Sequence, residues 1–202
     1  MTHRKALVLD GFEDECSTRM CIHNTLMSEL NLRGLEVKWV DLDRLRISPC
    51  RGCFGCWIKT PGICVIDDDA VSVTRLMAQC DLLVYLTPIV FGGVSPVLKS
   101  ILDRSICMVH PFFQRIRGET HHRKRYERYA PMIAIGIMCT SDPEEGRLFE
   151  QLMHRISINH LSPAHSSVVL SESLLSETTT EASHTLSSML GSLIDTVEVK
   201  GE

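Results

Sequence analysis

Four cysteines lie close together in one short segment of this 202-residue chain. They are Cys50, Cys53, Cys56 and Cys64, spaced as C-x2-C-x2-C-x7-C. Thiolates this close in sequence can bind one metal ion or cluster without closing long loops. Gly52, Gly55 and Gly62 allow the tight backbone turns that such binding requires. The segment is therefore predicted to carry metal or redox chemistry.

The spacing leaves three interpretations of these cysteines open: an iron–sulfur cluster, a zinc site, or unliganded thiols. Three cysteines at successive x2 intervals are closer to a bacterial cluster-binding run than to the two separated pairs of a zinc ribbon. A disulfide framework is not expected, because the chain has nine cysteines and shows no secretory segment. Cys80, Cys107 and Cys139 are expected to be small buried core residues. For Cys16, beside acidic residues, no reactive role is predicted.

Apolar runs and amphipathic stretches alternate along the chain and would position these cysteines. Strands are expected over residues 5–10, 35–42, 81–87, 132–138 and 166–170. Helices are expected between these strands and over 181–194. Because parallel strands need helical crossovers, this order predicts one α/β domain over residues 1–202, a doubly wound five-stranded parallel sheet with helices on both faces.

The ligand site of such a sheet lies at the carboxyl ends of its strands. This rule selects the loops 11–18, 88–93 and 140–145. The cysteine-motif loop at 48–66 follows the second expected strand, so it should border the same edge.

Charge and hydropathy exclude two classes of partner. The formal charge of −4 and the pI of about 6.1 do not favour nucleic acid. The apolar stretch at residues 6–9 is too short for a signal peptide or a membrane span, so no membrane contact and a cytoplasmic location are expected.

Two stretches resemble the iron–sulfur flavoproteins within the flavodoxin-like NAD(P)H-dependent FMN reductases. Residues 50–69 are similar to the compact cysteine motif of that family, followed by acidic residues. Residues 81–104 are similar to its strand, its P-x-[YF]-F-G flavin loop and its K-x-x-x-D-R helix, with Lys99, Asp103 and Arg104 in place.

The resemblance implies a flavodoxin-like fold, FMN at the sheet edge and NAD(P)H as electron donor. It also implies a 4Fe-4S cluster on the four cysteines and homodimers or homotetramers that bring the cluster and flavin of different subunits together. The implied redox partner is a small molecule or a ferredoxin-like protein. No side chain need act as an acid or base. The FMN-binding residues would be Gly11, Ser17, Thr18, Arg19, Pro88, Ile89, Val90, Phe91, Gly92, Gly93, Thr140 and Ser141.

The chain departs from the family pattern in both flavin loops. Gly11 is followed by Phe12 and by the acids Glu13, Asp14 and Glu15, where a Gly-Ser opening is usual. Carboxylates oppose phosphate binding at a helix start unless they point to water. Val90 replaces a common aromatic residue, so stacking on the flavin would depend on Phe91 or on another loop.

A basic insertion at 108–130 is expected to be a loop. It is either a solvated or subunit-bridging segment, or a cover that receives an anionic substrate or the phosphates of NADPH. Asp103 and Arg104 are expected to form a structural pair. The run from Asp67 to Asp69 is expected to cap a helix rather than to bind a divalent metal.

The predicted function is that of an FMN-dependent NAD(P)H oxidoreductase that passes electrons between the flavin and a cysteine-ligated cluster. One alternative is a non-enzymatic electron carrier of the same fold. Another is a flavin-free binding protein with a four-cysteine zinc site.

Overall fold

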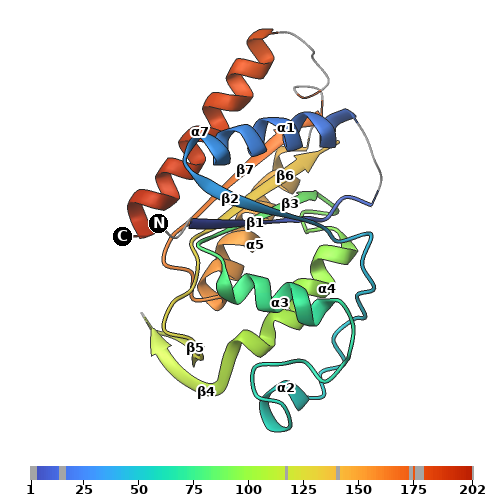
Figure 1. Cartoon of the computed structure of the whole chain (residues 1–202), viewed down its shortest axis with the longest axis vertical. Coiled ribbons are helices and arrows are strands. Elements are labelled where there is room, and N and C mark those ends of the chain that lie inside the picture. Colours follow the sequence, from blue (N-terminus) through green and yellow to red (C-terminus); the bar gives the residue numbers. More distant parts are fainter. Residues whose placement is uncertain are drawn as a thin grey trace.

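The computed structural model describes residues 4–13, 17–116, 118–139, 142–172, 175 and 180–201. Its centre is a five-stranded parallel sheet in the order β2-β1-β3-β6-β7 (Figure 1). The strands are β1 Arg4–Asp10, β2 Leu35–Asp41, β3 Leu82–Pro88, β6 Met132–Met138 and β7 His165–Ser171. This confirms the predicted flavodoxin-like α/β fold, whose strand order reverses between β1 and β3.

Two layers of helices cover the sheet. The long helices are α1 Ser17–Leu32, α3 Ala70–Gln79, α4 Pro96–Arg104, α5 Pro143–Asn159 and α7 Thr180–Gly201. Helices α1 and α7 pack side by side on one face of the sheet, and α3, α4 and α5 cover the other (Figure 1). No helix in the described ranges is long and apolar enough to cross a membrane.

Alternate residues of the central strands supply the two cores. Ala6, Val8 and Val84 face the layer of α1 and α7, whereas Leu7, Leu9 and Tyr85 face the opposite layer. All six side chains are at most 1% exposed. Strands buried on both faces read as continuous apolar runs, which is why the sequence predicted β3 and β6 to within one residue.

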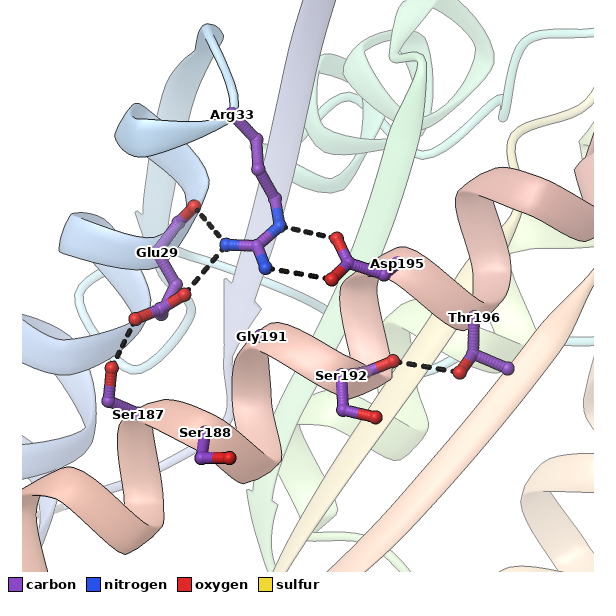
Figure 2. A pocket seen from close by; sticks show the side chains of 8 residues that line it. All are labelled: Glu29, Arg33, Ser187, Ser188, Gly191, Ser192, Asp195 and Thr196. Carbon is purple, nitrogen blue, oxygen red and sulfur yellow. Dashed lines mark hydrogen bonds and ion pairs between the residues drawn. The ribbon is translucent and has the colours of Figure 1, made fainter.

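Hydrogen bonds between side chains link α1 to α7 at the solvent-exposed edge of the contact between the two helices. Arg33 donates from Nε and Nη2 to the two carboxylate oxygens of Asp195, at 2.7 and 3.0 Å, and from Nη1 to Glu29 at 2.7 Å (Figure 2). Glu29 also accepts a hydrogen bond from Ser187. This bidentate geometry fixes the register of two helices that are far apart in sequence.

The basic insertion is not a loop, contrary to expectation. Strands β4 Val109–Ile116 and β5 Glu119–Lys124 form an antiparallel hairpin that is separate from the main sheet (Figure 1). Gly118, at a φ of +85°, lies in the connecting turn. The strands carry few of the alternating apolar residues that reveal a strand in sequence, because much of the hairpin is solvent-exposed.

Helix starts were predicted more successfully than the roles of individual acids. Ser95 caps α4 by accepting from the Leu98 N–H, with Pro96 at the first helical position. Asp142 caps α5 by accepting from the Glu144 N–H at 2.9 Å. At α3, however, Asp69 occupies the cap position without a side-chain cap bond, so the capping assigned to the acidic run is only partly correct.

Candidate functional site

The cysteine segment runs from β2 to α3 and contains one short helix, α2 Gly55–Ile58. Gly52 and Gly62 have φ values of +61° and +88°, which glycine adopts without strain. A Cβ on Gly55 would lie 2.6 Å from the side chain of Val65, so the two ends of the segment approach closely there. These three glycines therefore fold the segment tightly, as the sequence indicated.

The four predicted metal ligands line one cavity of about 880 Å³. Cys50 and Cys53 are exposed, Cys64 is half-buried, and Cys56 is 7% exposed. Other walls come from α4, α5 and the hairpin residue His122. Within the described ranges, no group of three or more His, Cys, Asp or Glu side chains is arranged to hold a metal ion. The cysteines thus share a cavity, and their ligand role stays a prediction.

The thiols that line this cavity influence one another electrostatically. Burial, together with the smaller effects of the neighbouring thiols of Cys107, Cys64, Cys50 and Cys53, raises the pKa of Cys56 to about 11. Without a cation, Cys56 is therefore a neutral thiol at pH 7. A bound metal ion or cluster reverses this preference, because it stabilises the thiolates that ligate it. The donor set suits a sulfur-ligated centre.

Cys107 is a fifth thiol beside this group, and the sequence did not predict that position. It is 1% exposed, and burial raises its pKa. Its burial agrees with the core role expected for it, as does the burial of Cys80. Cys139 is exposed, so the prediction of a buried thiol there was wrong; it follows the last residue of β6, where the strand leaves the core. Cys16 lies outside the described residues.

Arg104 connects α4 to both ends of the cysteine segment. Its guanidinium donates to both carboxylate oxygens of Asp68, at 3.0 and 2.8 Å, and to the carbonyls of Ser48 and Ile66, at 2.8 and 3.1 Å. The expected pairing of Asp103 with Arg104 was wrong, because Asp103 instead accepts from Lys99 four residues earlier on the exposed face of α4. The Arg104 guanidinium helps to lower the pKa of Asp68 to about 2, against the opposing effect of burial.

The loop after β3 forms a tight turn at the carboxyl edge of the sheet. Val90 and Gly93 exchange two backbone hydrogen bonds, of 3.1 and 2.9 Å, around Phe91 and Gly92. Phe91 and Gly92 have φ values of +49° and +72°, the combination found in a type I′ turn. Strained non-glycine backbone of this kind gathers at functional sites.

The turn presents the Phe91 ring to solvent, where it is 98% exposed. Gly92 donates from its N–H to Glu145 of α5 at 3.2 Å, and Ile89 donates to Ile137 of β6 at 2.7 Å. A Cβ on Gly92 would lie 2.8 Å from Leu148. The loop is therefore anchored on both sides, and its aromatic ring is available for stacking.

The first loop has an arrangement that the sequence analysis missed. Arg19, predicted to bind phosphate, pairs with Asp10 and Asp41 at 2.8 Å each. Asp10 is fully buried and also accepts from Trp39 Nε1 and the Phe12 N–H. Both acids end strands, β1 and β2, and a recurring terminal Asp was the signal in the sequence.

The remaining predicted FMN ligands are placed as follows. Gly11 follows β1 and donates its N–H to the Leu86 carbonyl at 2.8 Å. Ser17 and Thr18 begin α1, with Ser17 exposed and Thr18 buried. Pro88 ends β3. Thr140, Ser141 and the acids Asp14 and Glu15 lie outside the described residues. The structure thus brings Gly11 and the 88–93 loop to the β1–β3 edge, where this fold binds ligands.

Fold and sheet edge together define a flavodoxin-like α/β protein, and the comparisons with known proteins specify its family. The sequence profile of the family described as NADPH-dependent FMN reductase matches residues 5–172, so the chain belongs to that family. Its members are FMN-dependent oxidoreductases.

Two archaeal relatives carry the name iron–sulfur flavoprotein. One, from Archaeoglobus fulgidus, is 27% identical over 133 residues, which is 66% of this chain and 60% of the relative. Another, from Methanocaldococcus jannaschii, is 38% identical over 72 residues, 36% of each chain. The matches therefore span less than two thirds of these relatives.

Solved structures agree on the fold. An NAD(P)H:quinone oxidoreductase from Methanothermobacter marburgensis superposes with a TM-score of 0.67 at 12% identity, covering 95% of both chains. An FMN-dependent NADH-azoreductase from Bacillus anthracis superposes with a TM-score of 0.64 at 11% identity, covering 98% of this chain and all of the other.

Proposed function

We propose that this FMN-dependent oxidoreductase takes electrons from NAD(P)H and passes them between its flavin and a 4Fe-4S cluster held by Cys50, Cys53, Cys56 and Cys64. One observation carries the proposal. The cavity lined by the four thiols also reaches Gly93, the last residue of the turn that displays Phe91. Flavin and cluster sites would therefore lie next to one another within a single subunit.

The described side chains suit a binding and orienting role. FMN supplies hydride acceptance and one-electron chemistry when bound. Phe91 would stack on the flavin ring, and the turn from Val90 to Gly93 would fix its position against α5. The cavity wall formed by Leu102 and Ile106 would limit the access of water to the buried Cys56.

The names of the relatives support the cluster, and the family description supports NADPH. We further propose that the protein acts in the cytoplasm as a homodimer or homotetramer. Its acceptor would be a small molecule or a ferredoxin-like protein.

The first experiment is an absorption spectrum of anaerobically purified and reconstituted protein, with iron, sulfide, zinc and flavin analysis. The proposal predicts bound flavin with about four irons and four sulfides per chain. Cys53→Ser should lose iron and sulfide but keep its flavin and its fold, since Cys53 is exposed and outside both cores. Cys139→Ser, an exposed thiol outside the motif, is the matched control and should keep its iron.

Three outcomes would contradict the proposal. Flavin without iron would indicate a cluster-free FMN reductase, and zinc without flavin would indicate a binding protein. A flavin that dithionite reduces, but that NADPH and NADH leave oxidised, would indicate an electron carrier.

The flavin-free alternative is favoured by one specific observation, the pairing of Arg19 with Asp10 and Asp41. Two carboxylates already neutralise the cation that the family pattern assigns to phosphate. An FMN titration by fluorescence quenching distinguishes the two functions, because a flavin-free protein would show no binding at micromolar FMN.

A further inference from the structure

Arg104 has an unusual position for a cation. It is 1% exposed, and among the described residues it is the only buried lysine or arginine. Long cationic side chains are almost never fully buried without compensating partners. The burial of Arg104 therefore has to be explained by the groups that accept its hydrogen bonds.

Counting its donors leaves one unassigned. A guanidinium has five N–H groups, two on each Nη and one on Nε. The four hydrogen bonds to Asp68, Ser48 and Ile66 all come from the Nη atoms. Within the described part of the chain, Nε is buried and makes no hydrogen bond of ordinary geometry. A buried donor without a partner is rare and often marks a site that binds a water molecule, an ion or a cofactor.

The surroundings of this donor identify the chemical class of the missing acceptor. Arg104 lines the same cavity as the four cysteines. The Cys64 side chain is itself an interaction partner of Arg104, and the carbonyl of Ile66, two residues further on, accepts a hydrogen bond from Nη2. Sulfur is therefore the acceptor type that this part of the cavity offers, as thiolate or as cluster sulfide.

We propose that Arg104 is a positioning residue for the cysteine site, and that its Nε–H donates a hydrogen bond to sulfur of the bound cluster. The inference rests on the proposed function, because the acceptor is formed when the cluster binds. Hydrogen bonds to cluster sulfur raise the reduction potential by stabilising the added negative charge. The four Nη bonds hold both ends of the segment while the Nε–H meets the sulfur.

The decisive variant is Arg104→Lys, which keeps the positive charge but loses Nε–H and the planar fork. The reduction potential of the cluster is measured by a redox titration followed by electron paramagnetic resonance, with iron content determined in parallel. We expect the equilibrium constant for one-electron reduction to fall about tenfold, equivalent to a potential about 59 mV lower. Arg33→Lys is the matched control (Figure 2), because Arg33 is also bidentate to an aspartate but lies on the opposite layer. It should leave the potential unchanged.

A second variant decides the matter if Arg104→Lys fails to fold or loses its cluster. Asp68→Asn keeps an oxygen acceptor for Arg104 but removes the compensating charge, so the potential of the cluster should rise. An unchanged potential in the folded, cluster-loaded variants would overturn the role of Arg104 and leave the proposed function intact. A wild-type protein that binds no iron or sulfide after reconstitution would overturn both.

Discussion

At the scale of single residues, His160 joins two elements around the cysteine cavity. Ser105 donates its hydroxyl proton to the Leu102 carbonyl at 2.6 Å, so its oxygen accepts from His160 Nε2–H at 2.8 Å. The Tyr85 hydroxyl then donates to Nδ1 at 3.2 Å. When His160 is neutral, each polar atom in this network of Ser105, His160 and Tyr85 has a hydrogen-bond partner. Protonation of Nδ1 would place its N–H opposite the donating hydroxyl of Tyr85.

This arrangement predicts a loss of stability in mild acid. Burial lowers the pKa of His160 to about 4, whereas the unfolded chain has the ordinary value of about 6.5. The unfolded state therefore binds more protons between these values, and the free energy of unfolding falls as pH decreases from 6.5 towards 4. Between pH 7 and pH 5 we expect a loss on the order of 1–2 kcal/mol from this residue.

The measurement is urea unfolding of wild type and His160→Gln at both pH values. His160→Gln should be less stable at pH 7 and should depend less on pH. His184→Gln, an exposed histidine on α7, is the control and should keep the wild-type dependence. Equal pH dependence in wild type and His160→Gln would contradict the assignment.

The residue scale is also where prediction from the sequence was weakest. Motif spacing located the cysteine segment and the 88–93 loop. It did not reveal that Arg19 forms ion pairs with Asp10 and Asp41. Nor did it reveal that Arg104 forms its ion pair with Asp68 and not with its neighbour Asp103. These partners lie 9 to 36 residues apart and meet only because parallel strands and their crossovers bring them to one edge. A local pattern can mark an Asp at the end of a strand, but it does not identify the partner of that Asp.

At the scale of elements, the sequence was most informative where burial was most complete. The expected strand at 132–138 matches β6 residue for residue, because its apolar run is covered on both faces. The final helix, expected over 181–194, extends over Thr180–Gly201. The hairpin of β4 and β5 was missed because most of its residues face solvent. Such strands do not need the alternation of apolar and polar residues by which a strand is recognised in a sequence.

The tight packing of β6 against α5 and the flavin loop predicts opposite effects for two glycines. A Cβ on Gly136 of β6 would lie 2.6 Å from the Phe149 ring and 2.8 Å from Ile89, so Gly136→Ala should cost about 1–3 kcal/mol of stability. Ile89 lies in the flavin loop, so FMN binding should weaken as well. On α5, a Cβ on Gly146 meets nothing closer than 3.5 Å, and Gly146→Ala should stabilise by about 0.5–1 kcal/mol.

Denaturant unfolding and FMN titration of both variants check this pair. The two substitutions add the same methyl group, so their difference isolates the space available at each position. Gly136→Ala with wild-type stability, or Gly146→Ala with a large loss, would show that the packing between β6 and α5 differs from that described.

At the scale of the whole molecule, charge and apolar surface are unevenly distributed. The segment 110–129 carries six Lys or Arg and two Glu, a formal charge of +4, which leaves −8 on the rest of a chain of net −4. Its hairpin also exposes Phe112, Phe113 and Ile116, at 62%, 61% and 36%. An isolated two-stranded hairpin is marginally stable in water, so we expect another surface to cover it. Because the exposed face is apolar and basic, an acidic surface is the suitable partner.

The formal charge of −8 outside this segment makes a second copy of the chain a suitable partner, and the proposed homo-oligomer would cover the hairpin in this way. Phe112→Glu should then raise the dissociation constant at least about tenfold, because it removes a buried aromatic side chain and adds a desolvated charge at the interface. Light scattering across a dilution series measures this change. Leu32→Glu, at an exposed residue that ends α1, is the matched control and should assemble like wild type. A wild-type protein that stays monomeric at high concentration, or equal dissociation constants for the two variants, would show that the hairpin faces something other than a second copy.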